Sequence, residues 1–290
     1  MTVKIATAQY DISFLKSWSD YEQKINQWVQ QAVEENARIL LFPEYGSLEL
    51  ASLFPKEIYS SLEKQLSELQ TLHERFVNLY QQLASQHNCY IQAGTFPVKL
   101  ESGEYRNRAY LFMRDGSYDF QDKLQMTRFE NEQWLIKSGT ELKCFDTDFG
   151  KIAINVCYDS EFPLLARKQI EAGANLILVP SCTDTLAGYH RVKIGCQARA
   201  LENQCYVVQS PTVGVASWSE AVDINIGAAA VYTPVDRGFP DNGIAAMGEL
   251  NKTQWVFADL YLENIAKVRE EGQVFNYRDW PLQSRFINPL

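Results

Sequence analysis

The spacing of apolar and polar positions predicts a chain in which short buried strands alternate with amphipathic helices. Consecutive large apolar residues at 39–42 and 176–179 form runs that are too short for helices and are typical of strands buried on both faces. Between 62 and 83, apolar residues recur at three- and four-residue steps, which predicts one stripe on a helix of about six turns. Helical patterns over 22–35 and 164–172 each precede a strand run. Such alternation predicts an α/β protein with sheets covered by helices.

Segments of the first half of the chain return in the second half, in the same order. The pairs are 4–10 with 151–158, 37–43 with 174–180, 89–92 with 205–209, and 108–112 with 229–233. Each half therefore reads strand, helix, buried strand, long helix, strand, strand. We expect one domain over 1–290, with a pseudo-repeat of approximately 1–147 and 148–290. Two such halves stacked sheet against sheet predict a four-layer α-β-β-α sandwich.

Charge and hydropathy narrow the range of partners. The sum of 27 Lys and Arg against 36 Asp and Glu gives a net charge of −9. No basic cluster accompanies it, which argues against nucleic acid or an anionic membrane surface as a partner. No apolar run approaches the roughly 18 residues of a spanning helix. The first six residues read as a strand without the features of a secretion signal, so the expected location is cytoplasmic.

The cysteine and histidine counts argue against disulfide bonds and against a metal site. Six cysteines occur without a Cys-x-x-Cys pair, which predicts free thiols in a chain of this length. Only three histidines are present, and no metal-binding spacing of His and Cys occurs, so we expect no metal and no cofactor. If the protein is a hydrolase, its general base is therefore expected to be a carboxylate.

Three chemically reactive side chains follow predicted strands, where the loops of an α/β sheet carry functional groups. Glu44 follows the run 39–42, Lys123 follows 118–122, and Cys157 follows 152–156. Pro163 suits the first turn of the next helix, and the dipole of that helix is expected to favour the Cys157 thiolate. The other five cysteines are interpreted as small buried residues, Cys182 least securely because it follows the run 176–179.

These positions lie in strings that resemble the nitrilase superfamily of carbon–nitrogen hydrolases. The resemblance runs from residue 4 to residue 269, and the family fold is the same αββα sandwich. The strings are Leu41-Phe42-Pro43-Glu44, Asp122-Lys123-Leu124, Cys157-Tyr158-Asp159-Ser160-Glu161-Phe162-Pro163, and a stretch over 197–204 containing Arg199, Glu202 and Asn203.

The resemblance implies hydrolysis of a small amide or nitrile through a thioester on Cys157. Glu44 would take the thiol proton, and Lys123 would stabilise the oxyanion together with the backbone N–H of Tyr158. Many relatives use a second glutamate, for which Glu130 and Glu132 are candidates. Spacing after the lysine favours Glu130, and on a helix the two carboxylates would lie on different faces.

The remaining expectations concern the surroundings of this site. Arg199, Glu202 and Asn203 are expected to brace it, and the resemblance implies a homodimer or larger homo-oligomer. The segment 226–231 lacks the hydroxyl groups that many relatives carry, and the irregular segment 234–248 is expected to cap the pocket. Both departures indicate an outlying branch of the superfamily. The residues expected to line the pocket are Tyr45, Phe129, Trp134, Tyr158, Asp159, Ser181, Cys182 and Tyr189.

Two alternatives to hydrolysis remain open from the sequence. An acyltransferase would use the same cysteine and pass the acyl group to an amine instead of water. A non-catalytic scaffold would use the fold for binding alone, but it would have no need for a thiol, a base and a cation together.

Overall fold

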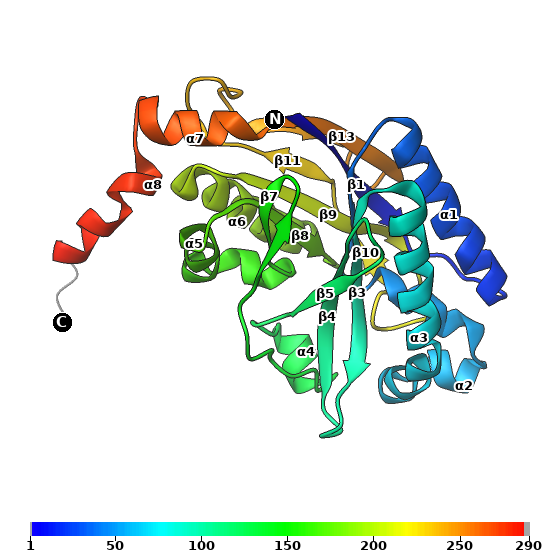
Figure 1. The fold of residues 1–290 in the computed structure, drawn as a ribbon. Coiled ribbons are helices and arrows are strands. Elements are labelled where there is room, and N and C mark those ends of the chain that lie inside the picture. Colours follow the sequence, from blue (N-terminus) through cyan, green and yellow to red (C-terminus); the bar gives the residue numbers. More distant parts are fainter. Residues whose placement is uncertain (1, 287–290) are drawn as a thin grey trace.

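The computed structural model describes residues 2–286 and contains two groups of strands (Figure 1). The first group has the order β13-β1-β2-β3-β4-β5 and the second β6-β7-β8-β9-β11-β12, with β10 beside β9. Hydrogen bonding links the groups where β1 and β9 pair at only two positions, Tyr10 with Thr212 and Asp11 with Val213. The strands are β1 (Thr2–Asp11), β2 (Ile39–Phe42), β3 (Tyr90–Lys99), β4 (Tyr105–Phe112), β5 (Tyr118–Asp122), β6 (Cys144–Thr147), β7 (Gly150–Ile154), β8 (Ala174–Ser181), β9 (Tyr206–Val215), β10 (Ile224–Asn225), β11 (Ala230–Tyr232), β12 (Ile244–Met247) and β13 (Gln254–Tyr261).

The two groups share one pattern of strand directions. In the first, β1, β2 and β3 are parallel, and antiparallel β13 and β4 flank them. In the second, β7, β8 and β9 are parallel, and antiparallel β6 and β11 flank them. The segments that echo each other in the sequence fall on equivalent strands of this pattern. The expectation of two similar halves is therefore confirmed.

Helices cover the outer face of each strand group, α1 and α3 on the first and α5 and α6 on the second (Figure 1). Ser17 caps α1 and Ser61 caps α3, each side chain accepting a backbone N–H of the first turn. The helices are α1 (Trp18–Glu34), α2 (Lys56–Tyr59), α3 (Leu62–His87), α4 (Arg128–Glu132), α5 (Pro163–Glu171), α6 (Leu186–Asn203), α7 (Leu262–Glu271) and α8 (Asn276–Asp279), with 3₁₀ turns η1 (Gly46–Leu53), η2 (Cys157–Glu161) and η3 (Trp280–Phe286).

Alternate residues of β2 enter different hydrophobic clusters. In β2, Leu40 and Phe42 pack in the cluster under α1 and α3, whereas Ile39 and Leu41 pack in the cluster that includes the second strand group. Because neighbouring side chains of a strand point to opposite faces, the sheet is buried on both sides. This arrangement gives the predicted order of layers, helix, sheet, sheet, helix.

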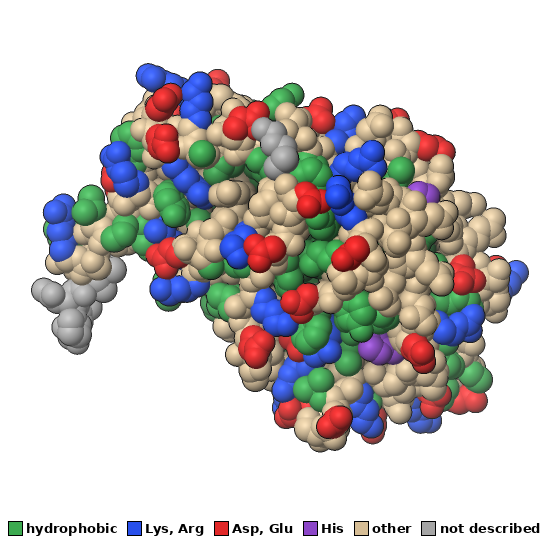
Figure 2. Space-filling view, in the orientation of Figure 1, with side chains coloured by type: hydrophobic (Ala, Val, Ile, Leu, Met, Phe, Trp, Pro, Cys, Tyr) green, Lys and Arg blue, Asp and Glu red, His purple; other side chains and the backbone are tan. Residues whose placement is uncertain are grey.

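The surface carries charges of both signs. Figure 2 shows Lys and Arg side chains interspersed with Asp and Glu on the face drawn there. Within residues 2–286, no helix is long and apolar enough to cross a membrane. Leu164 of α5 and Ile194 of α6 are 68% and 63% exposed on the outer layer of the second half. The expected homo-oligomer stays a prediction.

Candidate active site

Glu44 is placed by the end of β2 and by a close backbone approach. The glycine at 94 in β3 has φ +69°, and a Cβ there would lie 2.1 Å from the carbonyl oxygen of Pro43. Only glycine accommodates both this conformation and this contact. Tyr45 follows in a left-handed conformation with φ 56°, and its N–H donates to Oγ1 of Thr95 at 2.9 Å. The chain therefore turns sharply at Glu44, which is buried at 1% exposure.

Gly94→Ala tests this approach. We expect it to displace the Pro43–Glu44 peptide, to lower the free energy of unfolding by more than about 2 kcal/mol, and to reduce catalysis. The matched control is Gly103→Ala in the hairpin between β3 and β4, where φ is +87° but nothing lies within 4 Å of the added Cβ. Thermal unfolding and kcat/KM separate the two, and equal effects of both substitutions would contradict the close-contact argument.

Lys123 lies directly after β5, in a segment held from three sides. Its N–H donates to the carbonyl of Asn107 at 2.9 Å. Arg108 clamps the preceding residue, Asp122, with two hydrogen bonds of 2.7 and 3.0 Å. Beyond Lys123, the Asp159 carboxylate accepts the backbone N–H groups of residues 124 and 125. These contacts fix the backbone on both sides of Lys123. The Lys123 side chain extends into the interior and is 1% exposed.

Cys157 lies at the corner between β7 and η2, as the sequence predicts. Its φ of 49° is a left-handed conformation that costs a non-glycine residue free energy of order 1 kcal/mol or more. The carbonyl of Cys157 accepts the Ser160 hydroxyl at 2.6 Å, which closes the turn. α6 packs against this turn at Gly195, where a Cβ would approach the Ser160 carbonyl oxygen to 2.9 Å. Pro163 begins α5, as expected.

The three residues and Glu130 form one buried cluster. Lys123 Nζ lies 2.7 Å from Glu44 Oε1 and 2.7 Å from Glu130 Oε2. Cys157 Sγ contacts the carbonyl of Cys182 at 3.7 Å, and the N–H of Cys182 donates to Glu44 Oε2 at 3.0 Å. Besides burial, the negative charge of Glu44 also acts on the Cys157 thiol and raises its pKa. A thiol, a carboxylate and an ammonium are thus brought together from strand ends far apart in the sequence.

Three further residues complete the cluster; of these, the sequence predicts Tyr45 as a pocket wall and does not single out Asn107 or Thr127. Asn107 Nδ2 donates to Glu44 Oε1 at 2.8 Å and to Glu130 Oε1 at 3.2 Å. The Tyr45 hydroxyl donates to Glu130 Oε1 at 2.6 Å, and both the N–H and the hydroxyl of Thr127 donate to its Oε2 at 2.9 Å. For Asn107, the available signal was an uncharged amide between two arginines near the start of β4.

Burial and the cluster's own charges set the proton affinities. Burial raises the pKa of Glu44, Lys123 opposes this, and the charge of Glu130 adds to it. Burial would lower the pKa of Lys123, but Glu130 and Glu44 outweigh it and hold that pKa well above its ordinary value. For Glu130, burial is overcome chiefly by Lys123, so its pKa is lowered. The arrangement favours a cationic Lys123 and an ionised Glu130.

The Cys157 thiol does not have the lowered pKa that we expected from the helix dipole. Burial and the negative charge of Glu44 raise the pKa of Cys157 well above its ordinary value, and Lys123 only partly opposes them. The η2 turn separates Cys157 from α5, and the dipole effect falls off within the first turn of a helix. The resting group is therefore a thiol beside a carboxylate.

The structure distinguishes between the two candidate glutamates. Glu130 is 2% exposed and joins the cluster, whereas Glu132 forms an exposed ion pair with Arg128 at 2.8 Å. Thr127 caps α4, and its side chain and the Glu130 side chain form a capping box. This local motif turns the Glu130 carboxylate inward, toward Lys123.

The residues expected to line the pocket fall into different groups. The Trp134 ring is tilted against the Tyr45 ring, with centroids 4.9 Å apart, and Phe129 contacts Trp134. Tyr158 packs on Phe162, and Tyr189 is buried in α6.

Asp159 and Ser181 make hydrogen bonds to the backbone around the site, and their place in the pocket wall stays a prediction. The Asp159 carboxylate also accepts the N–H of Val156 at 3.1 Å, so backbone donors occupy it. The Ser181 hydroxyl donates to the Ser210 carbonyl at 3.3 Å, between β8 and β9. Cys182 contributes its backbone N–H and carbonyl to the cluster, while its thiol contacts Asn225 Oδ1 at 3.5 Å.

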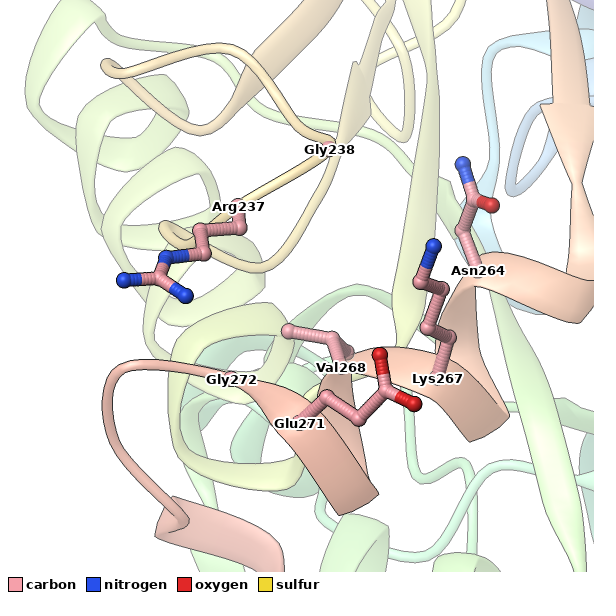
Figure 3. A pocket seen from close by; sticks show the side chains of 7 residues that line it. All are labelled: Arg237, Gly238, Asn264, Lys267, Val268, Glu271 and Gly272. Atoms are coloured by element: carbon pink, nitrogen blue, oxygen red, sulfur yellow. The ribbon is translucent and has the colours of Figure 1, made fainter.

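The segment 234–248 does not cap this site, contrary to expectation. It contains β12, and Phe239 packs against Tyr206, the first residue of β9, with ring centroids 5.8 Å apart. Tyr206 pairs with Leu176, near the start of β8, whereas the cluster lies beyond the other end of that strand. Part of the segment lines a separate cavity of about 310 Å³ beside α7 (Figure 3). The long segment is explained by packing on α7.

Arg199, Glu202 and Asn203 of α6 support the turn after Cys157, as expected. Arg199 Nε lies 2.6 Å from Glu202 Oε1, and its Nη1 donates to the Ser160 carbonyl in the turn after Cys157 at 3.0 Å. Asn203 Nδ2 donates to the Arg199 carbonyl at 3.1 Å. For metals, no group of three or more His, Cys, Asp or Glu side chains in residues 2–286 is arranged to hold an ion.

Comparisons with known proteins agree with the fold and the motifs. Residues 4–260 match the carbon–nitrogen hydrolase family. The probable hydrolase YhcX of Bacillus subtilis is 35% identical over 96% of this chain, which spans 53% of that protein. The deaminated glutathione amidase of Dictyostelium discoideum is 26% identical over 89% of this chain and 88% of its own length.

The fold also matches solved structures. Saccharomyces cerevisiae Nit3, a member of branch 10 of the nitrilase superfamily, superposes with a TM-score of 0.74 at 22% identity, covering 93% of each chain. This chain spans about half the length of YhcX, but nearly all of Nit3. The match across residues 4–260 shows that the chain belongs to the carbon–nitrogen hydrolase family, and the likeness to Nit3 shows that the two share a fold.

Proposed function

We propose that the protein hydrolyses the carbon–nitrogen bond of small amides through a thioester on Cys157. The observation that carries this proposal is the buried contact of Lys123 Nζ with Glu44 and Glu130, 2.7 Å from each, beside the thiol. Burying three charged groups has a large desolvation cost, which packing alone does not require. Family membership supports the same class of reaction.

The first half of the reaction transfers the acyl group to sulfur. The sulfur of Cys157 forms a bond to the amide carbon as its proton passes to Glu44, and the π electrons move to the carbonyl oxygen. Lys123 stabilises that oxyanion, together with the N–H of Tyr158 at the start of η2, where backbone N–H groups lack acceptors within the turn. The carbon–nitrogen bond then breaks, Glu44 returns the proton to nitrogen, and ammonia or an amine leaves.

The second half releases the acid. Water attacks the thioester carbon as Glu44 accepts one of its protons, and the carbon–sulfur bond breaks. The departing sulfur recovers the proton from Glu44, so the enzyme returns to its resting state and the product is a carboxylic acid. Lys123 remains protonated throughout, consistent with the strongly raised pKa that its two carboxylate neighbours cause.

The proposed role of Glu130 is to fix and polarise Lys123. Five donors reach its carboxylate, from Lys123, Asn107, Tyr45 and two groups of Thr127. A carboxylate offers about four lone-pair sites, so Glu130 has no free site for a water or substrate proton. It acts through Lys123, as a positioning residue.

Trapping the thioester tests the proposal. We expect rapid acid quenching during turnover of a panel of small amides to leave an acyl mass on the peptide that contains Cys157. Adding an amine during turnover distinguishes hydrolysis from acyl transfer, because transfer would convert the amine to a new amide. Cys144→Ser, on β6, is the control for labelling of other thiols. Absence of any adduct on Cys157 across amides and nitriles would overturn the proposal.

The pH dependence provides a second check. Glu44 must be ionised to accept the thiol proton, and its pKa is raised, so kcat/KM should fall on acidification with a midpoint above the ordinary glutamate value. Lys123 and Cys157 have raised pKa values, so the activity should show no alkaline limb below about pH 10. An activity that instead rose through the ordinary thiol pKa of about 8.5 would indicate attack by a preformed thiolate.

A further inference from the structure

The Asn107 side chain bonds to both buried glutamates, Glu44 and Glu130, and has no role in the proposed reaction steps. Its Nδ2 atom donates to Glu44 at 2.8 Å and to Glu130 at 3.2 Å, so both amide hydrogens are committed to carboxylates. The residue is fully buried on β4. Its backbone is also fixed, because its carbonyl accepts the N–H of Lys123.

The orientation of this amide is determined by charge. A flipped amide would direct its oxygen at two carboxylates, with repulsion in place of two charge-assisted hydrogen bonds. In the observed orientation, Oδ1 is buried and has no hydrogen-bond partner within the described residues. An unsatisfied buried acceptor costs about 1–3 kcal/mol. The two hydrogen bonds made by Nδ2 therefore contribute more free energy than the unsatisfied Oδ1 costs.

These bonds distinguish the two oxygens of Glu44. Oε1 accepts from both Lys123 and Asn107, which occupies its two lone-pair sites. Within the described residues, Oε2 accepts one hydrogen bond, from the N–H of Cys182 at 3.0 Å, and one lone-pair site remains. This asymmetry leaves Oε2 for the thiol proton.

We propose that Asn107 is a positioning residue that occupies Oε1 of Glu44 and thereby makes Oε2 the atom that exchanges protons with Cys157 and with the leaving nitrogen. The proposal rests on the function proposed above and extends it to a residue outside the Glu–Lys–Cys set. Without Asn107, the carboxylate is free to rotate toward Lys123 and away from the sulfur. The two glutamates also lose the donor that lies between them.

The acid limb of the pH profile is the readout, because Asn107 stabilises the ionised form of Glu44. The groups that face Glu44 from the surrounding elements are Lys123, Glu130, Cys157, Cys182 and Tyr45. Of these side chains, only that of Glu130 also bonds to the Asn107 side chain within the described residues, and five donors hold it ionised. Loss of Asn107 therefore acts on the acid limb mainly through Glu44.

The experiment compares Asn107→Leu and Asn107→Asp with the unaltered protein. Asn107→Leu should move the acid limb of kcat/KM upward by about one pH unit and lower kcat roughly tenfold at the plateau, with KM little changed. Asn107→Asp adds a third carboxylate and should move the limb further in the same direction. If Asn107→Leu fails to fold, Asn107→Asp, which keeps the shape of the side chain, supplies the test.

Asn203→Leu is the matched control. Within the described residues, Asn203 is also fully buried and also leaves Oδ1 without a partner, but its Nδ2 donates to the Arg199 carbonyl and to Glu202 Oε1, away from Glu44. It should lower the melting temperature without moving the acid limb. An unmoved limb in both Asn107 variants, with the Cys157 adduct still forming in the unaltered protein, would overturn the role of Asn107 alone. Absence of that adduct would overturn the proposed function itself.

Discussion

Cys157→Ser is expected to lower kcat/KM for amides by more than about 10³-fold while the fold is kept. The hydroxyl is a far weaker acid than the thiol, so Glu44 cannot generate the attacking atom, and an ester would replace the thioester. Serine has nearly the same shape as cysteine, so the contacts of η2 are preserved. Steady-state kinetics and the mass of the intact protein measure the loss.

Cys157→Gly shows whether that loss comes from chemistry or from unfolding. Glycine adopts the φ of 49° at this corner without strain, so the variant should unfold at a temperature no lower than that of Cys157→Ser. It should be as inactive as the serine variant. Cys144→Ser, on β6, should retain full turnover, because this thiol contacts the Gln169 carbonyl and not the cluster. Substantial activity in either Cys157 variant would contradict nucleophilic catalysis by this residue.

Lys123→Met is expected to lower the free energy of unfolding by about 3–5 kcal/mol and to abolish turnover. The substitution removes the cation from between two buried carboxylates, which leaves Glu44 and Glu130 facing each other. Their pKa values must then rise, since neither charge is compensated. The oxyanion loses its stabilising charge at the same time. Denaturant unfolding and amide turnover measure the two effects.

The pH dependence of the Lys123→Met variant identifies the cause of its instability. Its folded carboxylates hold protons that the unfolded chain releases near pH 4, so the folded state binds more protons and stability falls as pH rises. The deficit should therefore be largest at neutral pH and smallest in acid. A second substitution, Glu130→Gln in the Lys123→Met background, should recover part of the stability and none of the activity. A pH-independent deficit would point to lost packing instead.

The sequence predicted the fold and the main reactive residues because both rest on local signals. Strand runs, helix stripes and turn residues are set by neighbours along the chain, and Glu44, Lys123 and Cys157 each follow a strand. The spacing from Lys123 to Glu130 is local as well. These features allowed the layer order and the placement of the three side chains to be predicted without coordinates.

The parts that the sequence did not predict depend on contacts between distant segments. Asn107 joins Glu44 and Glu130 across 63 and 23 positions, and no spacing rule connects them. The acidity of Cys157 was misjudged because burial and Glu44 outweigh the dipole of a helix that begins six residues later. The irregular segment 234–248 was assigned to the wrong end of the sheet, since its length says nothing about which strand end it covers.

The two halves of the chain are joined by more than the short β1–β9 pairing, because β13 of the C-terminal half pairs with β1 at eight positions. Glu44, Lys123 and Glu130 are carried by the N-terminal half, and Cys157 and the Cys182 N–H by the C-terminal half. Neither half holds a complete set of reactive groups. If the two halves were expressed together as separate fragments, turnover would return only when they associate. Turnover would therefore report the association of the two halves.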